Sequence, residues 1–313
     1  MSLHGIGLVA RHEVRTRLRT GHWKRLMAVW FVIVNGLGLL LRVSMDSDDS
    51  AYPDASGVAA FGVTMLLVLA LTLMVTPALS GQSINGDRER GTLATLQITR
   101  LGPGDIALGK LAAAWGTGVL TLLFALPCVL LPVVEGAIGP GRVAVVLLVT
   151  VLLIGVVCAV AQGWSALLPR TVTSMLMSYL TVFALLLGTV LLYVVGTAVV
   201  SEHTSVRSDR AVWWTLAPNP LVVLADAAPR LPERRVVDGD AVVDESPPDV
   251  LADMSRLVRD MREEDLADDR VENNAVWPYG LAFDLALAAG AVGVTIARLR
   301  TPHTRIPRGV RVA

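Results

Sequence analysis

The chain has 313 residues, of which 53% are apolar and only 17% charged, and its formal net charge is zero. A soluble domain of this length needs more charged side chains to cover its surface, so the composition excludes a soluble globular protein. The apolar residues also gather in blocks long enough for a helix to cross a bilayer, which takes about 20 residues.

The N-terminal segment, residues 3–25, is predicted to form an amphipathic helix in the membrane interface, where anionic lipid would hold it. The first spanning helix follows at about 24–41. Because the basic segment is long and no small-residue cleavage site follows, we interpret this span as uncleaved rather than as a signal peptide. On the N-terminal helix, one face is apolar and the other carries Arg and His. The apolar side chains are Leu3, Ile6, Val9, Ala10, Val14 and Leu18.

The remaining apolar blocks predict five further spans. Both ends of the chain are basic, whereas the segments 42–57 and 201–278 are acidic. The positive-inside rule therefore predicts that both termini are cytoplasmic, that 201–278 is extracytoplasmic, and that the protein is a multi-pass protein of the cell membrane. These five spans lie at about 58–79, 111–134, 143–168, 172–200 and 279–297.

The predicted fold is thus an all-α membrane protein with six transmembrane helices and an amphipathic N-terminal interfacial helix. We divide the chain into three parts. Residues 1–200 hold the N-terminal helix, five spans and a cytoplasmic segment at 80–110; residues 201–278 form an extracytoplasmic segment; residues 279–313 hold the sixth span and a basic tail.

Three features are expected within the extracytoplasmic segment. Residues 213–228 are apolar enough to sit at the interface or to dip into the membrane. Residues 234–249 are acidic and rich in Pro, which favours a loop. Apolar residues at helical spacing predict a helix over 249–270.

The cytoplasmic segment 80–110 is the most informative part of the sequence. It begins with the charged run Gly86-Asp-Arg-Glu-Arg90, continues with apolar residues at Leu93, Leu96 and Ile98, and is broken at 102–104 by Gly-Pro-Gly. Asp105 is placed to cap the helix that enters the third span. A short amphipathic helix at this position is either a docking surface for a partner or a solvated connection between two spans.

This segment resembles the hallmark of the type-2 ABC exporter permeases. That family shows Glu, one or two basic residues, Gly-Thr-Leu, a second Leu one turn later, and Gly-Lys where the third span opens. The chain departs from the family after the second Leu, where the family often has Thr-Pro and this chain has Thr99-Arg100. Elsewhere, Asn219-Pro220 is similar to the start of the family's re-entrant segment. The matching residues are Glu89, Arg90, Gly91, Thr92, Leu93, Leu96, Gly109 and Lys110.

The resemblance implies a permease subunit without a cofactor or catalytic residues of its own. A separate ABC ATPase, which carries ATP and Mg, would dock on 80–110, and two permease chains, identical or different, would complete the translocator in the lipid bilayer. Glu89 and Arg90 would then make polar contacts, and Leu93 and Leu96 would pack into the partner or the bundle. The sequence leaves the transported substrate open.

The sequence also suggests two alternatives to a permease. A membrane scaffold or sensor would use the acidic outer segment to bind a ligand and would transport nothing. An intramembrane hydrolase using Asp284 lacks a second acid in the neighbouring spans.

Other signals for chemistry are weak. The chain has no His-Glu-x-x-His and no Gly-x-Ser-x-Gly motif, and its five His show no metal-ligand spacing. The stretch 104–111 resembles a P-loop but has Leu111 where the motif requires Ser or Thr. The basic ends are explained by topology rather than by nucleic acid.

Polar side chains inside the predicted spans form a candidate intramembrane polar site: Asp284, Gln162 and Asn35. Interhelical hydrogen bonding is the ordinary explanation for Gln162 and Asn35. For Asp284, a structural hydrogen bond competes with proton coupling or substrate contact. Cys128 and Cys158 lie in apolar blocks and are expected to be buried by packing.

Overall fold

The computed structural model describes residues 2–19, 21–45, 55–93, 101–203, 212–231, 234–238, 241–245, 248–262 and 275–300. Six helices in this part are long and apolar enough to cross a membrane. The predicted all-α fold and the six spans are therefore confirmed, and the chain is a multi-pass membrane protein.

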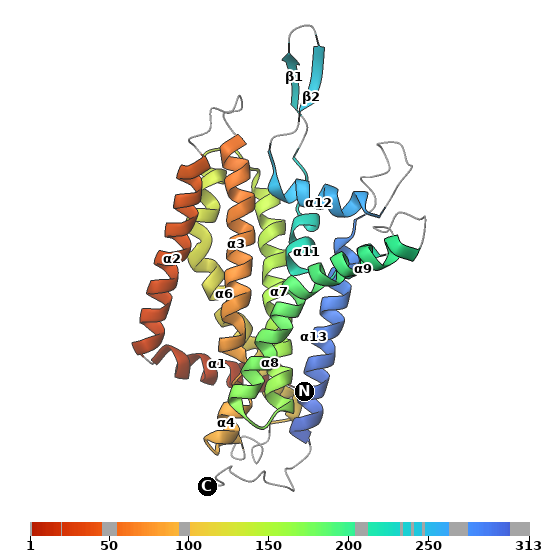
Figure 1. Cartoon of the computed structure of the whole chain (residues 1–313). Helices are drawn as coiled ribbons and strands as arrows, with labels where there is room; N and C mark the ends of the chain where they lie inside the picture. The colour runs from red at the N-terminus through yellow and green to blue at the C-terminus, as the bar shows by residue number, and fades with distance from the viewer. Residues whose placement is uncertain are drawn as a thin grey trace.

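The spanning helices form one bundle, with α7 at its centre against α3, α6, α8 and α13 (Figure 1). We call the end that holds α1, α4 and the last turn of α13 the basal end, and the end that holds α12 the distal end. The six spans are α2 (Gly21–Met45), α3 (Ala55–Ser80), α6 (Pro103–Val134), α7 (Pro140–Leu167), the composite α8–η1–α9 (Thr171–Phe183, Ala184–Gly188, Thr189–His203) and α13 (Trp277–Arg300).

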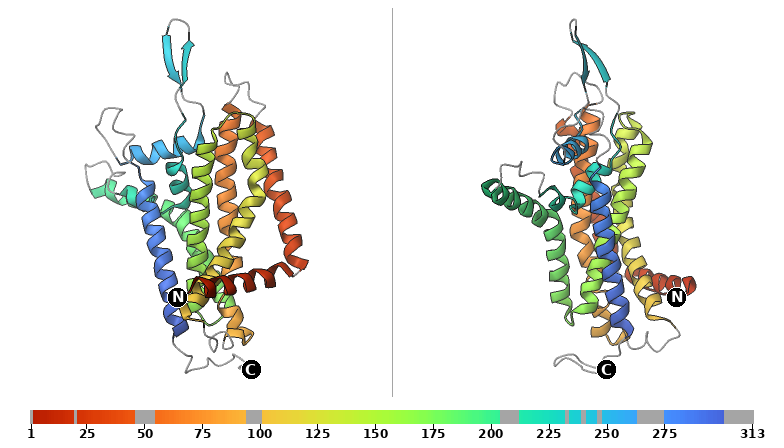
Figure 2. Two further views of the ribbon diagram at one scale, coloured as in Figure 1. Left: turned by 180° about the vertical axis from the view of Figure 1, so that it is seen from behind. Right: turned by 90° about the vertical axis from the view of Figure 1, so that its right-hand side faces the viewer.

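The N-terminal helix α1 (Leu3–Arg19) runs across the basal end, crosswise to the spanning helices (Figure 2). The continuous helix expected over 3–25 is thus divided, and α2 already begins at Gly21. The division follows the change in pattern, because α1 is apolar on one face only, whereas the chain after Trp23 is apolar all round. The orientation of α1 is that of an interfacial helix.

The third span is longer than predicted, because α6 begins at Pro103 rather than near 111. Pro103 occupies the first helical position, where its missing N–H is not needed. Asp105 accepts a hydrogen bond from the backbone N–H of Gly102 at 3.1 Å, which closes the start of the helix. The cap predicted for Asp105 therefore lies at the start of one continuous helix.

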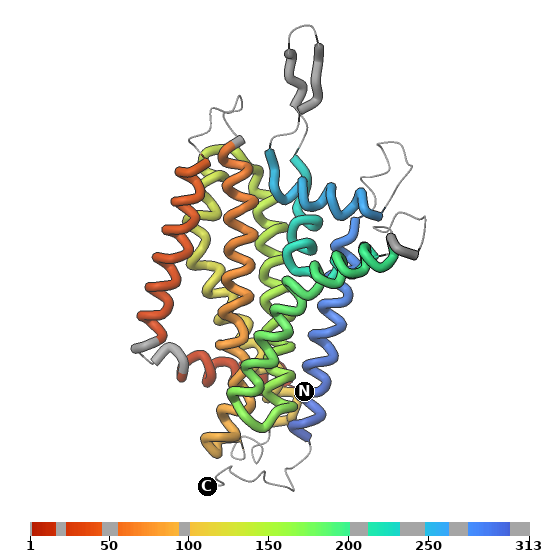
Figure 3. Tube along the Cα trace, in the orientation of Figure 1, coloured from red at the N-terminus to blue at the C-terminus, as the bar shows by residue number. Residues whose placement is uncertain are grey.

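The fifth span bends at its π-helical segment η1, after which α9 leaves the bundle (Figures 2 and 3). Asn219 lies beside this segment and is buried. Its Nδ2 donates to the carbonyl oxygen of Leu186 and to Oγ1 of Thr189, both at 2.9 Å. A π segment interrupts the regular backbone hydrogen bonds of an α-helix. Asn219 donates a hydrogen bond to one carbonyl oxygen of this segment, that of Leu186.

The same Asn219 caps α11 (Pro220–Ala227), which follows the short 3₁₀ turn η2 (Trp213–Thr215). Helix α11 is buried against α7, α12 and α13. At about 1.5 Å per residue its eight residues are too short to cross a bilayer. The apolar stretch 213–228 therefore enters the bundle without crossing it.

Buried ion pairs hold the distal end together. Asp226 of α11 accepts from Nε of Arg259 in α12 (Val250–Asp260) at 2.5 Å and from the backbone N–H of Val276 at 2.6 Å. Arg142, at the start of α7, pairs with Asp249 at 2.6 Å, and Asp249 also caps α12. These bonds fix α11 and α12 to the ends of α7 and α13.

The segment 234–249, which we predicted to be a loop, contains an antiparallel hairpin. Strand β1 (Arg234–Asp238) pairs with β2 (Ala241–Glu245), with Asp238 opposite Ala241. Two Val residues in each strand favour extended backbone. Only Gly239 and Asp240 separate the strands, and a Gly-x pair of this kind favours a two-residue hairpin connection.

Two glycines of α13 allow a test of this packing. A Cβ on Gly280 would lie 1.9 Å from the backbone oxygen of Ala217, whereas one on Gly290 would meet nothing within 4 Å. We expect Gly280→Ala to destabilise the protein by about 1–3 kcal/mol, because backbone has to move. Gly290→Ala should not destabilise it. Thermal unfolding in detergent measures both, and equal melting temperatures for the two variants would contradict the close contact.

Candidate functional site

The segment 80–110 leaves the basal end of α3 and returns at α6. A short helix, α4 (Asn85–Glu89), follows α3 through a turn. Gly91 has a φ of +72°, in the left-handed region that only glycine adopts readily. The Gly of the motif is thus needed for the turn that ends α4.

The charged residues of the motif are accessible. Glu89, Arg90 and Thr92 are exposed at the basal end. Glu89 Oε1 accepts from the backbone N–H of Thr171 at 3.2 Å and from its hydroxyl at 2.5 Å. Because Thr171 is the first residue of α8, a carboxylate here also satisfies an unpaired N–H at the positive end of that helix. Glu89 therefore joins α4 to the start of the fifth span.

The apolar residues of the motif are divided. Leu93 is buried in a small basal cluster with Ile84, Ile106 and Leu299. It packs into the bundle, which was one of the two positions expected for it. Leu96 falls in 94–100, outside the residues that the structure describes.

Gly109 and Lys110 face α1 rather than the basal surface. A Cβ on Gly109 would lie 2.6 Å from Cβ of Val9 and 2.9 Å from the backbone oxygen of Ile6. Glycine thus allows α1 to lie directly on α6. Gly109 is therefore needed for the close packing of α1 on α6. The next residue, Lys110, is buried beneath α1.

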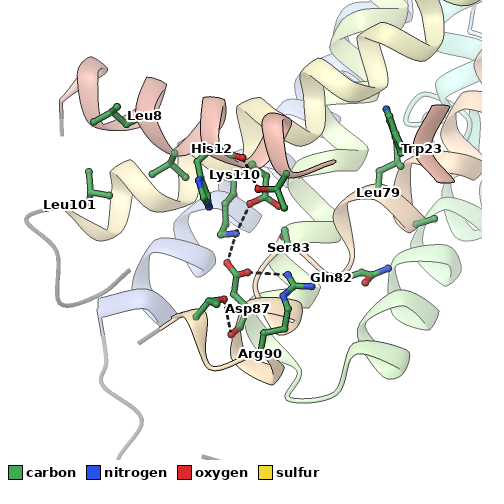
Figure 4. A pocket seen from close by; sticks show the side chains of 15 residues that line it. Leu8, His12, Trp23, Leu79, Gln82, Ser83, Asp87, Arg90, Leu101 and Lys110 are labelled. Carbon is green, nitrogen blue, oxygen red and sulfur yellow. Dashed lines mark hydrogen bonds and ion pairs between the residues drawn. The ribbon is translucent and has the colours of Figure 1, made fainter. Parts of the chain in front are cut away.

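Lys110 is only 1% exposed, and its ammonium lies between two carboxylates (Figure 4). Its Nζ is 2.5 Å from Oδ2 of Asp87 and 3.3 Å from Oε2 of Glu13. The other oxygen of Asp87 accepts from Nη2 of Arg90 at 3.1 Å. The cluster, which we call the basal ion network, therefore ties together α1, α4 and α6.

A second bond fixes the start of α1. The backbone N–H of Ser2 donates to Oδ1 of Asp105 at 2.8 Å, while Oδ2 of the same carboxylate caps α6. The interfacial helix is thus attached to α6 at both Asp105 and Lys110. A displacement of α4 would act on α1 through these contacts.

Sequence reasoning missed three members of this arrangement: Asp87, Glu13 and Thr171. Glu13 carried a signal, because it is the only acid among the first 25 residues and stands among basic ones. Asp87 lies within the charged run 86–90, and nothing in that run distinguishes it from its neighbours. Nothing near Thr171 in the sequence indicates a contact with residue 89.

The three polar residues of the spans do not form one site. Asn35 accepts from the backbone N–H of Cys128 and donates to the carbonyl of Phe124, whereas Gln162 donates to the carbonyl of Ala107. These contacts lie about 25 Å apart along α6, at about 1.5 Å per residue. Both side chains make the interhelical bonds that were their ordinary explanation.

Asp284 is different. Its side chain faces the bundle and is 1% exposed, and neither carboxylate oxygen has a hydrogen-bond partner among the described residues. The structural hydrogen bond favoured for it is therefore not found in the part of the chain that the structure describes.

The described residues form neither a nucleotide-binding loop nor a metal site. The P-loop-like stretch 104–111 lies within helix α6 and forms no loop. No group of three His, Cys, Asp or Glu side chains with metal-site geometry occurs among the described residues. Cys128 and Cys158 are both buried, as packing predicted.

Comparison with known proteins leaves the chain unassigned: it matches no protein-family model and none of the curated proteins.

The basal ion network predicts strong coupling between two substitutions. Among the described residues, Lys110→Met leaves the exposed Arg90 as the cation beside Asp87, and we expect a loss of about 3 kcal/mol in the free energy of unfolding. Asp87→Asn alone leaves the buried Lys110 with Glu13 and should also destabilise. The double variant, which removes both charges, should be more stable than the sum of the single effects predicts. Unfolding in detergent measures all three, and additivity within about 0.5 kcal/mol would contradict the pairing.

Proposed function

We propose that this chain is the permease subunit of an ABC exporter, coupled to a separate ATPase subunit through the segment 80–110. The observation that supports the proposal best is the arrangement of Glu89, Arg90 and Thr92. These motif residues are exposed at the end of the short helix α4 and directly after it, and α4 is bonded to α8 through Glu89 and to α6 through Asp87.

The geometry suits the transmission of a mechanical displacement. A partner that pushes on α4 would act on α8 through Glu89 and Thr171. It would act on α6 and α1 through Asp87 and Lys110. Since these contacts are short and charged, α4 would move together with the helices it touches rather than slide past them.

The orientation proposed for the subunit places the basal end, and both termini, in the cytoplasm of the cell. Basic side chains of the short basal connections and of the last turn of α13 support this assignment by the positive-inside rule. Among them are Arg88, Arg90, Arg170, Arg298 and Arg300.

A second permease chain is part of the proposal. The outer face of α8, η1 and α9 is apolar and exposed over its length. Lipid covers such a face in a monomer, and a second six-span chain would cover part of it in a translocator. The exposed residues include Val172, Leu176, Leu180, Phe183, Leu187 and Leu191.

The double variant Glu89→Ala with Arg90→Ala tests the coupling. Removal of two polar contacts, each worth about 0.5–1.5 kcal/mol, should weaken association with the ATPase about tenfold. Co-purification with an ABC ATPase subunit from the source cell, together with the ATP turnover of that ATPase, is the measurement. Arg256→Ala at the distal end is the matched control and should retain full association.

Thr171→Val separates docking from the internal role of Glu89. It removes the hydroxyl donor to Glu89 without changing the exposed surface of α4. If Thr171→Val alone weakens ATPase association as much as the double variant does, Glu89 acts by anchoring α8 rather than by contact. If no ATPase associates with the unmodified chain and vesicles show no ATP-dependent flux, the scaffold or sensor alternative replaces the proposal.

A further inference from the structure

A cavity of about 830 Å³ lies at the basal end between α1, the end of α3, α4 and the start of α6 (Figure 4). Its volume is that of a site for a small organic molecule. One wall is the interfacial helix α1, so the cavity lies at the depth where lipid headgroups meet protein.

The cavity contains a polar group that the protein leaves unsatisfied. Ser83 lines it and is only 5% exposed, and its Oγ has no hydrogen-bond partner among the described residues. A buried hydroxyl without a partner is unfavourable, which indicates that a bound group supplies one. Ser80, the last residue of α3, is also buried and its Oγ also has no hydrogen-bond partner in the described part of the chain, but it does not line the cavity.

The charged lining is balanced. Glu13 and Asp87 supply two carboxylates, and Lys110 and Arg90 supply two cations. Lys110 is engaged by both carboxylates, whereas the Arg90 side chain remains 65% exposed with further guanidinium N–H groups beyond its bond to Asp87. A ligand with a net charge would disturb this balance. A zwitterion would preserve it, with its anion at Arg90 and its cation near Glu13.

The remainder of the cavity is apolar. Trp23 and Leu79 line the side toward α2, and Leu8 and Leu101 line the opposite side. Trp23 stands where the chain enters the first span, a position at which aromatic residues meet the headgroup region. A ligand that fits has a polar zwitterionic end and an apolar end.

We propose that this cavity binds the headgroup of a phospholipid that joins a phosphate to a primary ammonium, as phosphatidylethanolamine does. The phosphate accepts from Arg90 and from Ser83 Oγ, the ammonium donates to Glu13, and an acyl chain lies along Leu79 and Trp23. A choline headgroup lacks the N–H donors, and a glycerol headgroup lacks the cation.

The bound lipid would stand between α1 and α4 and stabilise the basal ion network. This site does not depend on the exporter function, because lipid binding can be measured without an ATPase. Failure of the lipid experiment would therefore leave the proposed function untouched, and the reverse also holds.

The test uses the full chain, purified in detergent and stripped of lipid. Phosphatidylethanolamine, phosphatidylglycerol and phosphatidylcholine with identical acyl chains are titrated, and bound lipid is followed by native mass spectrometry and by the melting temperature. We expect the ethanolamine lipid to bind most tightly. Ser83→Ala should weaken its binding about tenfold without lowering the melting temperature of the lipid-free protein.

Ser80→Ala is the matched control and should bind the ethanolamine lipid as the unmodified chain does. Equal binding of the three lipids, or equal loss in both Ser variants, would overturn the proposal. Soluble phosphoethanolamine forms the last arm. If phosphoethanolamine raises the melting temperature at the same concentration as the lipid does, the apolar side of the cavity is not used. This result would also overturn the assignment to a lipid.

Discussion

The ammonium of Lys110 is the group on which the basal end depends. A cation that is 1% exposed at the edge of a membrane is tolerated only with acids beside it, and Asp87 and Glu13 come from two other elements. The requirement to neutralise one charge therefore fixes where α1 and α4 lie relative to α6. The position of α4 in turn determines where the exposed side chains of Glu89 and Arg90 lie.

The distal end is organised by the same principle with opposite signs. There a buried carboxylate, Asp226, collects donors from Arg259, Ser255 and the backbone at the start of α13. Each end of the bundle thus has a charged centre that joins elements far apart in the chain. Between them the helices pack by apolar contacts and by glycines such as Gly163, where a Cβ would lie 3.0 Å from Ala291.

The spans could be predicted because hydropathy is a local property of the sequence. The number of spans and the position of α1 followed from it, and so did the burial of Cys128 and Cys158. The start of α6 and the division at Gly21 could not be predicted, because they depend on which elements pack nearby. The hairpin was missed because charge and Pro content outweighed the two Val pairs on either side of Gly239 and Asp240.

The π segment η1 has a consequence for the surface of the fifth span. One additional residue in a helical turn rotates every following side chain by about 100° relative to an uninterrupted α-helix. Exposed apolar residues continue through η1, at Leu180, Phe183, Leu187 and Leu191, but α9 bends away from the bundle, so the apolar faces of α8 and α9 follow two different axes. A partner or a lipid that follows this helix meets two surfaces joined at Leu186, whose carbonyl is held by Asn219.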